Sequence, residues 1–185
     1  GLERIWGEAC PTARGFVGAN PPLLVTKGGT LLPVGKEGLG KAVSCPEGFP
    51  GRHASCCINE DGIHVAWLKS GVQGFFAATL VPGERAEVDH LLKEREIAQL
   101  EMIHTADGPL ALFTSEQGGE MSPVACYGVE LPAGVRPFPV LEDANVDVER
   151  VLPFHSDGAL RVACQTMDDA IIVLDVVGGK SKRWG

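Results

Sequence analysis

Residues 155–180 read HSDGALRVACQTMDDAIIVLDVVGGK and contain one complete structural unit. The unit begins with Asp157-Gly158, a turn dipeptide in which glycine reaches positive φ without a Cβ clash and aspartate caps the turn. An apolar strand follows, then a polar turn at 165–169, then a second apolar strand that ends at Gly178-Gly179. This pattern predicts a β-hairpin that packs on other hairpins, because a single hairpin cannot bury both of its faces.

The same pattern occurs elsewhere in the chain. Asp61-Gly62 begins a unit that aligns with the first one without a gap, at an offset of 96 residues. Asp107-Gly108 begins a third unit with a longer turn, and Gly28-Gly29 begins a weaker fourth. Internal repeats of this length indicate equivalent supersecondary units that stack around a common core.

Glycine and proline separate short apolar runs along most of the chain, which is typical of all-β proteins. In several runs apolar and polar residues alternate, so that Ile63, Val65 and Trp67 share one face. We expect Trp67 and Phe75 to be core residues. The predicted strands are Leu23–Thr26, Thr30–Val34, Ala54–Ile58, Ile63–Leu68, Gly74–Val81, Leu110–Thr114, Val124–Leu131, Val151–Phe154, Ala159–Gln165 and Ala170–Val177.

One segment departs from the β pattern. Glu84–Met102 contains no glycine or proline, is rich in helix formers and opens with acidic residues, as a helix N-terminus prefers. The sequence therefore predicts a mostly β fold of stacked antiparallel hairpins with one helix near 84–102. It is expected to form a single domain over 1–185, or two sub-units, 1–83 and 103–185, joined by that helix.

The unit at 155–180 resembles a blade of the WD40 β-propeller family. Asp157-Gly158 resembles the turn before the second strand of such a blade, and 167–170 resembles the next turn. Leu174-Asp175 stands where the family usually has Trp-Asp. Asn59–Pro82 and Ala106–Pro132 are weaker versions. The resemblance implies a propeller, or part of one, that serves as a platform for protein interaction.

The chain is also similar to a tandem pair of polo boxes. The offset of 96 residues and a helix that follows the first unit favour this alternative. It implies a phosphopeptide-binding or targeting module of a regulatory or kinase-like protein.

Charge and composition narrow the classes of partner. The net charge is −8 without a long basic stripe, which argues against phosphate-neutralising contacts with nucleic acid. No apolar run approaches the roughly 18 residues of a membrane span. The six cysteines show no disulfide spacing, so we expect a reduced, intracellular protein of the cytoplasm or nucleus.

Two motifs suggest an enzyme or a metal site, and both are incomplete. Residues 35–41 nearly spell a phosphate-binding loop, but Ala42 replaces the required Ser or Thr, so a nucleotide-binding enzyme is a weak alternative. His53, Cys56, Cys57 and His64 lie close in sequence, yet adjacent cysteines on a strand point to opposite faces. We therefore expect no catalytic residue, metal or cofactor.

Three residues place polar or cationic groups on otherwise apolar hairpins: His64, Lys69 and Arg161. A solvated face accounts for them, or they contact a partner. Because Arg binds carboxylate and phosphate oxygens well, the predicted partner is a protein or peptide that is acidic or phosphorylated. The sequence thus predicts a non-catalytic scaffold or adaptor module of a larger intracellular assembly.

Overall fold

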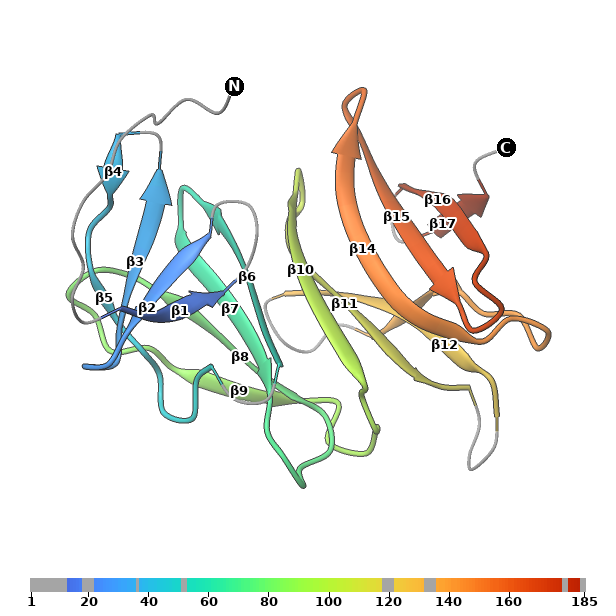
Figure 1. Cartoon of the computed structure of the whole chain (residues 1–185), viewed down its shortest axis with the longest axis horizontal. Helices are drawn as coiled ribbons and strands as arrows, with labels where there is room; N and C mark the ends of the chain where they lie inside the picture. The colour runs from blue at the N-terminus through green and yellow to red at the C-terminus, as the bar shows by residue number, and fades with distance from the viewer. Residues whose placement is uncertain are drawn as a thin grey trace.

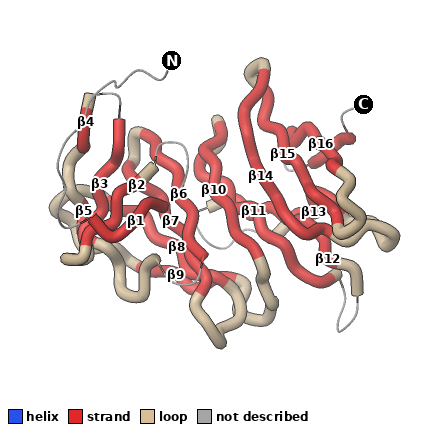
Figure 2. The backbone as a smooth tube through the Cα atoms, viewed as in Figure 1, coloured by secondary structure: helices blue, strands red, loops and turns tan. Residues whose placement is uncertain are grey.

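The chain folds into four antiparallel β-sheets that follow one another along the sequence (Figure 1). Figure 2 shows strands joined by loops and turns, with no helix among the described residues. The mostly β fold class is therefore confirmed. The computed structural model describes residues 13–17, 22–35, 37–50, 53–117, 122–131, 136–177 and 180–183.

The strands of each sheet are consecutive in sequence. The first sheet contains β1 (Ala13–Val17), β2 (Leu23–Thr26), β3 (Thr30–Gly35), β4 (Gly38–Leu39) and β5 (Val43–Ser44). The second sheet contains β6 (His53–Asn59), β7 (Gly62–Leu68), β8 (Phe75–Leu80) and β9 (Val88–Leu91). The third sheet contains β10 (Gln99–Thr105), β11 (Gly108–Glu116), β12 (Val124–Glu130) and β13 (Phe138–Leu141). The fourth sheet contains β14 (Val148–Ser156), β15 (Ala159–Thr166), β16 (Ile171–Val177) and β17 (Lys180–Arg183).

The sheets are joined along their first strands. In each of the last three sheets the strands pair in chain order, and β10 runs beside both β6 and β14. The sheets are arranged in series along the longest axis of the molecule, with the first sheet at one end and the fourth at the other (Figure 1). Over the residues that the structure describes, the four sheets do not close into a ring.

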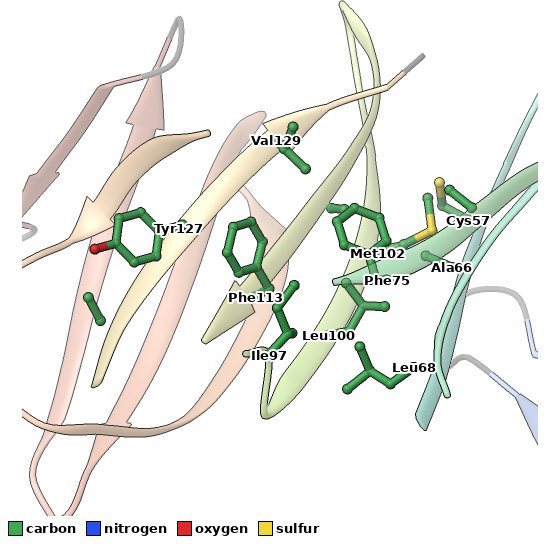
Figure 3. Packing of buried hydrophobic residues seen from close by; sticks show 13 residues of the cluster. Cys57, Ala66, Leu68, Phe75, Ile97, Leu100, Met102, Phe113, Tyr127 and Val129 are labelled. Carbon is green, nitrogen blue, oxygen red and sulfur yellow. The ribbon is translucent and has the colours of Figure 1, made fainter. Parts of the chain in front are cut away.

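Three hydrophobic cores fill the spaces between neighbouring sheets. Because successive side chains on a strand point to opposite faces, one sheet contributes to two cores. In the third sheet, for example, Phe113 packs toward the second sheet and Leu112 toward the fourth. Figure 3 shows the core between the second and third sheets, which includes Leu68, Phe75, Leu100, Met102, Phe113 and Tyr127.

All ten predicted strands are present, with ends that differ by a few residues. Trp67 and Phe75 are core residues, as predicted. The strands that the sequence did not predict are β1, β4, β5, β9, β10, β13 and β17. Most of these are four residues long or shorter, too short for a clear alternation of apolar and polar residues.

The helix predicted near 84–102 is wrong. This segment instead forms the edge strand β9, a loop and the start of β10. Leu100 and Met102 alternate with exposed or half-buried neighbours and are both buried against the second sheet. Sheet packing thus overrides local helix propensity. The connection between the sub-units proposed for 1–83 and 103–185 is therefore not helical.

The repeated units form equivalent hairpins in the second and fourth sheets. Their strand register, however, differs from the gapless sequence alignment at an offset of 96 residues. In the second sheet Asn59 pairs with Gly62, whereas in the fourth sheet Ser156 pairs with Ala159. Gly62 is therefore equivalent to Ala159, one residue beyond the offset of 96. As a result His64 and Arg161 occupy the same position in their sheets.

Candidate interaction site

Arg161 lies on the face of the fourth sheet that points away from the third. In register it stands between Phe154 on β14 and Asp175 on β16. Its Nε donates a hydrogen bond to Asp175 Oδ1 at 3.0 Å, and its Nη1 donates to Asp157 Oδ2 at 3.2 Å. Two carboxylates of the same sheet therefore bind the guanidinium that we expected to contact an acidic partner.

The equivalent positions in the other sheets are covered. We call the face of a sheet that points toward the next sheet in the chain its forward face, and the opposite one its rear face. His64 on the second sheet and Leu110 on the third are forward-face residues at the position of Arg161, and both are buried. The fourth sheet has no following sheet in the described part of the chain.

The forward face of the fourth sheet has apolar residues at its centre, and Arg150, Gln165 and Asp175 lie on the same face. Ile171 is 71% exposed and Leu152 is 61% exposed, although both belong to regular strands. Between them lie Ala163 and Val173, which are half-buried and paired with each other. We define the last-sheet face by the residues Leu152, Phe154, Arg161, Ala163, Ile171, Val173 and Asp175.

The rear face of the first sheet carries an apolar row beside the polar residues Thr26 and Thr30. Phe16, Leu24 and Leu32 form one row across β1, β2 and β3. Phe16 is 66% exposed, whereas Leu24, between its two neighbours, is buried. We define the first-sheet face by these three residues. The series of sheets therefore has exposed apolar side chains at each end: Phe16 at one, and Leu152 and Ile171 at the other.

His64 lies inside the molecule instead of on a surface. Its Nε2 is 2.8 Å from Asn59 Oδ1, and its Nδ1 is 3.0 Å from Thr79 Oγ1. An Nε2–H donor and an Nδ1 that accepts from the Thr79 hydroxyl satisfy both contacts with a neutral ring. Burial lowers the pKa of His64, with Asp61 acting in the opposite direction.

A cavity of about 330 Å³ opens beside His64, between the second and third sheets. Asp61, Asp89 and Asp107 are among its lining residues. The rim is therefore acidic and unsuited to the acidic or phosphorylated peptide that the sequence suggested.

Lys69 is exposed where β7 ends, at the opposite end of that strand from Asp61-Gly62. The three predicted site residues thus lie at three separate places. His64 is between the second and third sheets, Lys69 is on a turn, and Arg161 is on the last-sheet face. The structure does not bring them together into one surface.

The motifs that suggested an enzyme or a metal are parts of the β framework. β3 and β4 form a tight hairpin in which Gly35 pairs with Gly38, so the glycine-rich segment belongs to a sheet. Cys56 packs in the core between the first two sheets and Cys57 in the next core, which confirms their opposed directions. Burial raises the pKa of each of these thiols to about 12.

The other described cysteines are free thiols, and Cys10 lies outside the described residues. In the core between the third and fourth sheets, a hydrogen bond with Cys164, together with burial, raises the pKa of Cys126. Among the described residues no group of three or more ligating side chains is placed to hold a metal ion. The part of the chain that the structure describes has no helix suited to crossing a membrane.

The sequence did contain a signal for the last-sheet face. Residues 171–174 are apolar without interruption, and Val151 is followed by Leu152. Continuous apolar runs are typical of strands that are covered on both faces. The structure buries Ile172 and Leu174 on one face and leaves Ile171 exposed on the other.

The chain was compared with protein-family models, with curated proteins and with solved structures, and none of them matches.

Proposed function

We propose that this chain is a non-catalytic protein–protein interaction module that serves as a scaffold or adaptor in a larger intracellular assembly. The observation that carries the proposal is the last-sheet face. Soluble proteins rarely expose contiguous apolar patches larger than roughly a few hundred Å², and patches above that size mark interaction sites. Here Ile171 stands at a position that is fully buried in the second and third sheets, and Leu152 is exposed on the same face.

The arrangement of strands supports a propeller-type module over a pair of polo boxes. Each of the last three sheets has four antiparallel strands in chain order, which is how propeller blades are built. The helix that favoured the polo-box resemblance is replaced by β9 and β10. A phosphopeptide would also have to displace Asp157 or Asp175 from Arg161.

The chemistry of the buried polar groups supports a non-catalytic role. Burial lowers the pKa of His64 and so favours the neutral ring, which can satisfy its contacts with the Asn59 amide oxygen and the Thr79 hydroxyl. The thiolate is the nucleophilic form of cysteine, and burial disfavours it at Cys56 and Cys57.

The test is capture of binding partners from the native cell with three forms of the protein. One is the parent, one carries Leu152→Glu and Ile171→Glu, and one carries Met167→Glu. Met167 is 65% exposed in the turn after β15 and is a matched control for adding charge to an exposed apolar residue. We expect partners to be lost with the first variant and retained with the second.

The circular dichroism spectrum and unfolding midpoint of each form should be unchanged, because the replaced side chains are exposed. Partners that are captured equally by all three folded forms would contradict the proposal that this face binds them.

A further inference from the structure

We propose that this protein binds a second copy of itself head to tail, with the last-sheet face of one copy packed on the first-sheet face of the other. The inference rests on the proposed function, because it takes the chain to be an interaction module. It goes beyond that function by naming the partner and both contacting surfaces.

The first step is that the chain already contains this kind of contact. The forward face of the second sheet, with Ala66, Leu68 and Phe75, packs on the rear face of the third, with Phe113 and Tyr127. Figure 3 shows these side chains facing each other across the space between the two sheets. The forward face of the third sheet packs on the rear face of the fourth in the same sense.

The second step is that the last-sheet face matches the covered forward faces along β16 and at its centre, whereas Leu152 stands where the covered faces have Ser55 and Glu101. Arg161 pairs with Asp175 in the fourth sheet, as the equivalent His64 pairs with Thr79 in the second. Four residues before Asp175 and Thr79 on these strands stand Ile171 and Phe75, which are therefore equivalent. In the third sheet the same register makes Cys126 the equivalent residue. Phe75 and Cys126 are both 0% exposed, whereas Ile171 is 71% exposed.

The centre of the face follows the same pattern. Ala163 and Val173 are paired where the second sheet has Ala66 and Ala77. Small or branched side chains at this point let two sheets approach closely, near the roughly 10 Å spacing of stacked sheets. The last-sheet face therefore has the shape of a forward face that lacks its next sheet.

The third step identifies the occupant. A forward face packs on a rear face, and the first-sheet face is a rear face against which no described sheet packs, with Phe16 exposed, Leu24 buried and Leu32 half-buried. Every copy of the chain carries one face of each kind, so a second copy supplies the complement in equal amount. Within one chain the two faces lie at opposite ends of the molecule and do not meet (Figure 1).

The symmetry of this contact limits the assembly. A head-to-tail contact uses two different surfaces, so it either closes into a ring or continues as an open chain. Two copies together contribute eight sheets, which lies within the range of roughly four to eight blades in closed propellers. We therefore expect a closed dimer in which both pairs of faces are covered.

The experiment measures the mass of the intact chain in solution by sedimentation over a wide range of concentration. The parent should sediment at twice the chain mass of 19.5 kDa. Phe16→Glu and Ile171→Glu should each sediment as a monomer, because each lacks one of the two faces needed for any contact. Met167→Glu, charged at an exposed turn position, should remain dimeric.

A mixture of the two monomeric variants gives the sharpest result. The intact last-sheet face of Phe16→Glu can still bind the intact first-sheet face of Ile171→Glu. The mixture should therefore recover a weaker, open dimer that neither variant forms alone. A face that binds its own kind would instead leave one of the two variants fully dimeric.

Two results would overturn the inference. One is a parent protein that is monomeric at every concentration, and the other is a dimer that survives Phe16→Glu. A monomeric parent that still captures another protein, and loses it with Leu152→Glu and Ile171→Glu, would leave the proposed function standing and remove only the second copy as partner. Unchanged unfolding midpoints show that each variant is folded.

Discussion

Trp67 shows how one side chain can hold two parts of the chain together. It is 1% exposed and lies in the core between the first and second sheets. Its ring meets Phe49 edge-on at 5.6 Å between centroids and stacks on Phe76, also at 5.6 Å. Such aromatic pairs stabilise a core beyond the area that they bury.

Replacing Trp67 with Ala should lower the free energy of unfolding by about 3–5 kcal/mol, because it leaves a cavity and removes both ring contacts. Urea unfolding followed by circular dichroism measures the loss. Met167→Ala, at an exposed position, should change stability by less than about 0.5 kcal/mol. A similar small effect for Trp67→Ala would mean that this core is not packed as described.

Glu101 is a residue whose ionisation should make the stability of the protein depend on pH. Its carboxylate accepts a hydrogen bond from the Ser55 hydroxyl at 2.9 Å, and Ser55 Oγ in turn accepts from the Met102 backbone N–H. Burial raises the pKa of Glu101, and the Ser55 hydrogen bond opposes that rise. A carboxyl group with a raised pKa favours the folded state most when it is protonated.

The stability contributed by Glu101 is thus fully present below its ordinary pKa and is lost as the pH rises through the raised one. Glu101→Gln does not titrate and keeps an oxygen acceptor for Ser55. We expect the variant to unfold at a higher temperature than the parent at neutral pH, with the difference shrinking toward about pH 4. Equal midpoints at neutral pH would contradict this expectation.

At the scale of elements, the segment between the second and third sheets shows how packing selects structure. Val88–Leu91 adds an edge strand to β8, and His90 stacks on Phe76 at 4.4 Å between centroids. Beyond it, Leu92 adopts φ 50°, and the chain turns back toward Gly74. A continuous helix would point Leu100 and Met102 to opposite sides, so it could not bury both of them against the second sheet.

Gly74 is the residue that this turn requires. Its φ is +73°, its N–H donates to the Arg95 carbonyl at 2.7 Å, and the backbone carbonyl of Leu91 lies where a Cβ would stand. Gly74→Ala should therefore cost on the order of 1–3 kcal/mol. Thermal unfolding measures it, and Gly71→Ala, with similar φ but open space, separates conformational strain from the clash. If both variants lose the same free energy of unfolding, the contact between the new Cβ and the Leu91 carbonyl does not explain the cost of Gly74→Ala.

Turn chemistry explains what the sequence could show at this scale and what it could not. Alternating apolar residues and Asp-Gly dipeptides predicted the hairpins. The same dipeptide, however, occupies two different turn positions. Asp157 and Gly158 both have positive φ and lie in the turn, whereas Gly62 already pairs with Asn59 at the start of a strand. Because both units contain the same Asp-Gly dipeptide, the sequence alignment missed the shift of one residue that makes Arg161 equivalent to His64.

At the scale of the whole molecule, the sequence identified Arg161 as unusual but not its surroundings. Arg161 binds carboxylates of its own sheet, and Asp157 is only four residues away in the chain. Leu152 and Ile171 were not predicted as site residues, because a sequence pattern does not distinguish an exposed leucine or isoleucine from a buried one. Which face of a strand stays uncovered depends on how many sheets follow it, and this is a property of the assembly.

Each core is shared by two neighbouring sheets only, so the stability of the molecule should pass from sheet to sheet as in a linear array. The second and third sheets are held on both faces, and their amide hydrogens should exchange last with solvent. Within a single chain the outer sheets are held on one face, so they should open first in a monomeric variant such as Ile171→Glu. An array of this kind can gain or lose a whole sheet without rebuilding the remaining cores, because every cut between sheets exposes the same kind of surface.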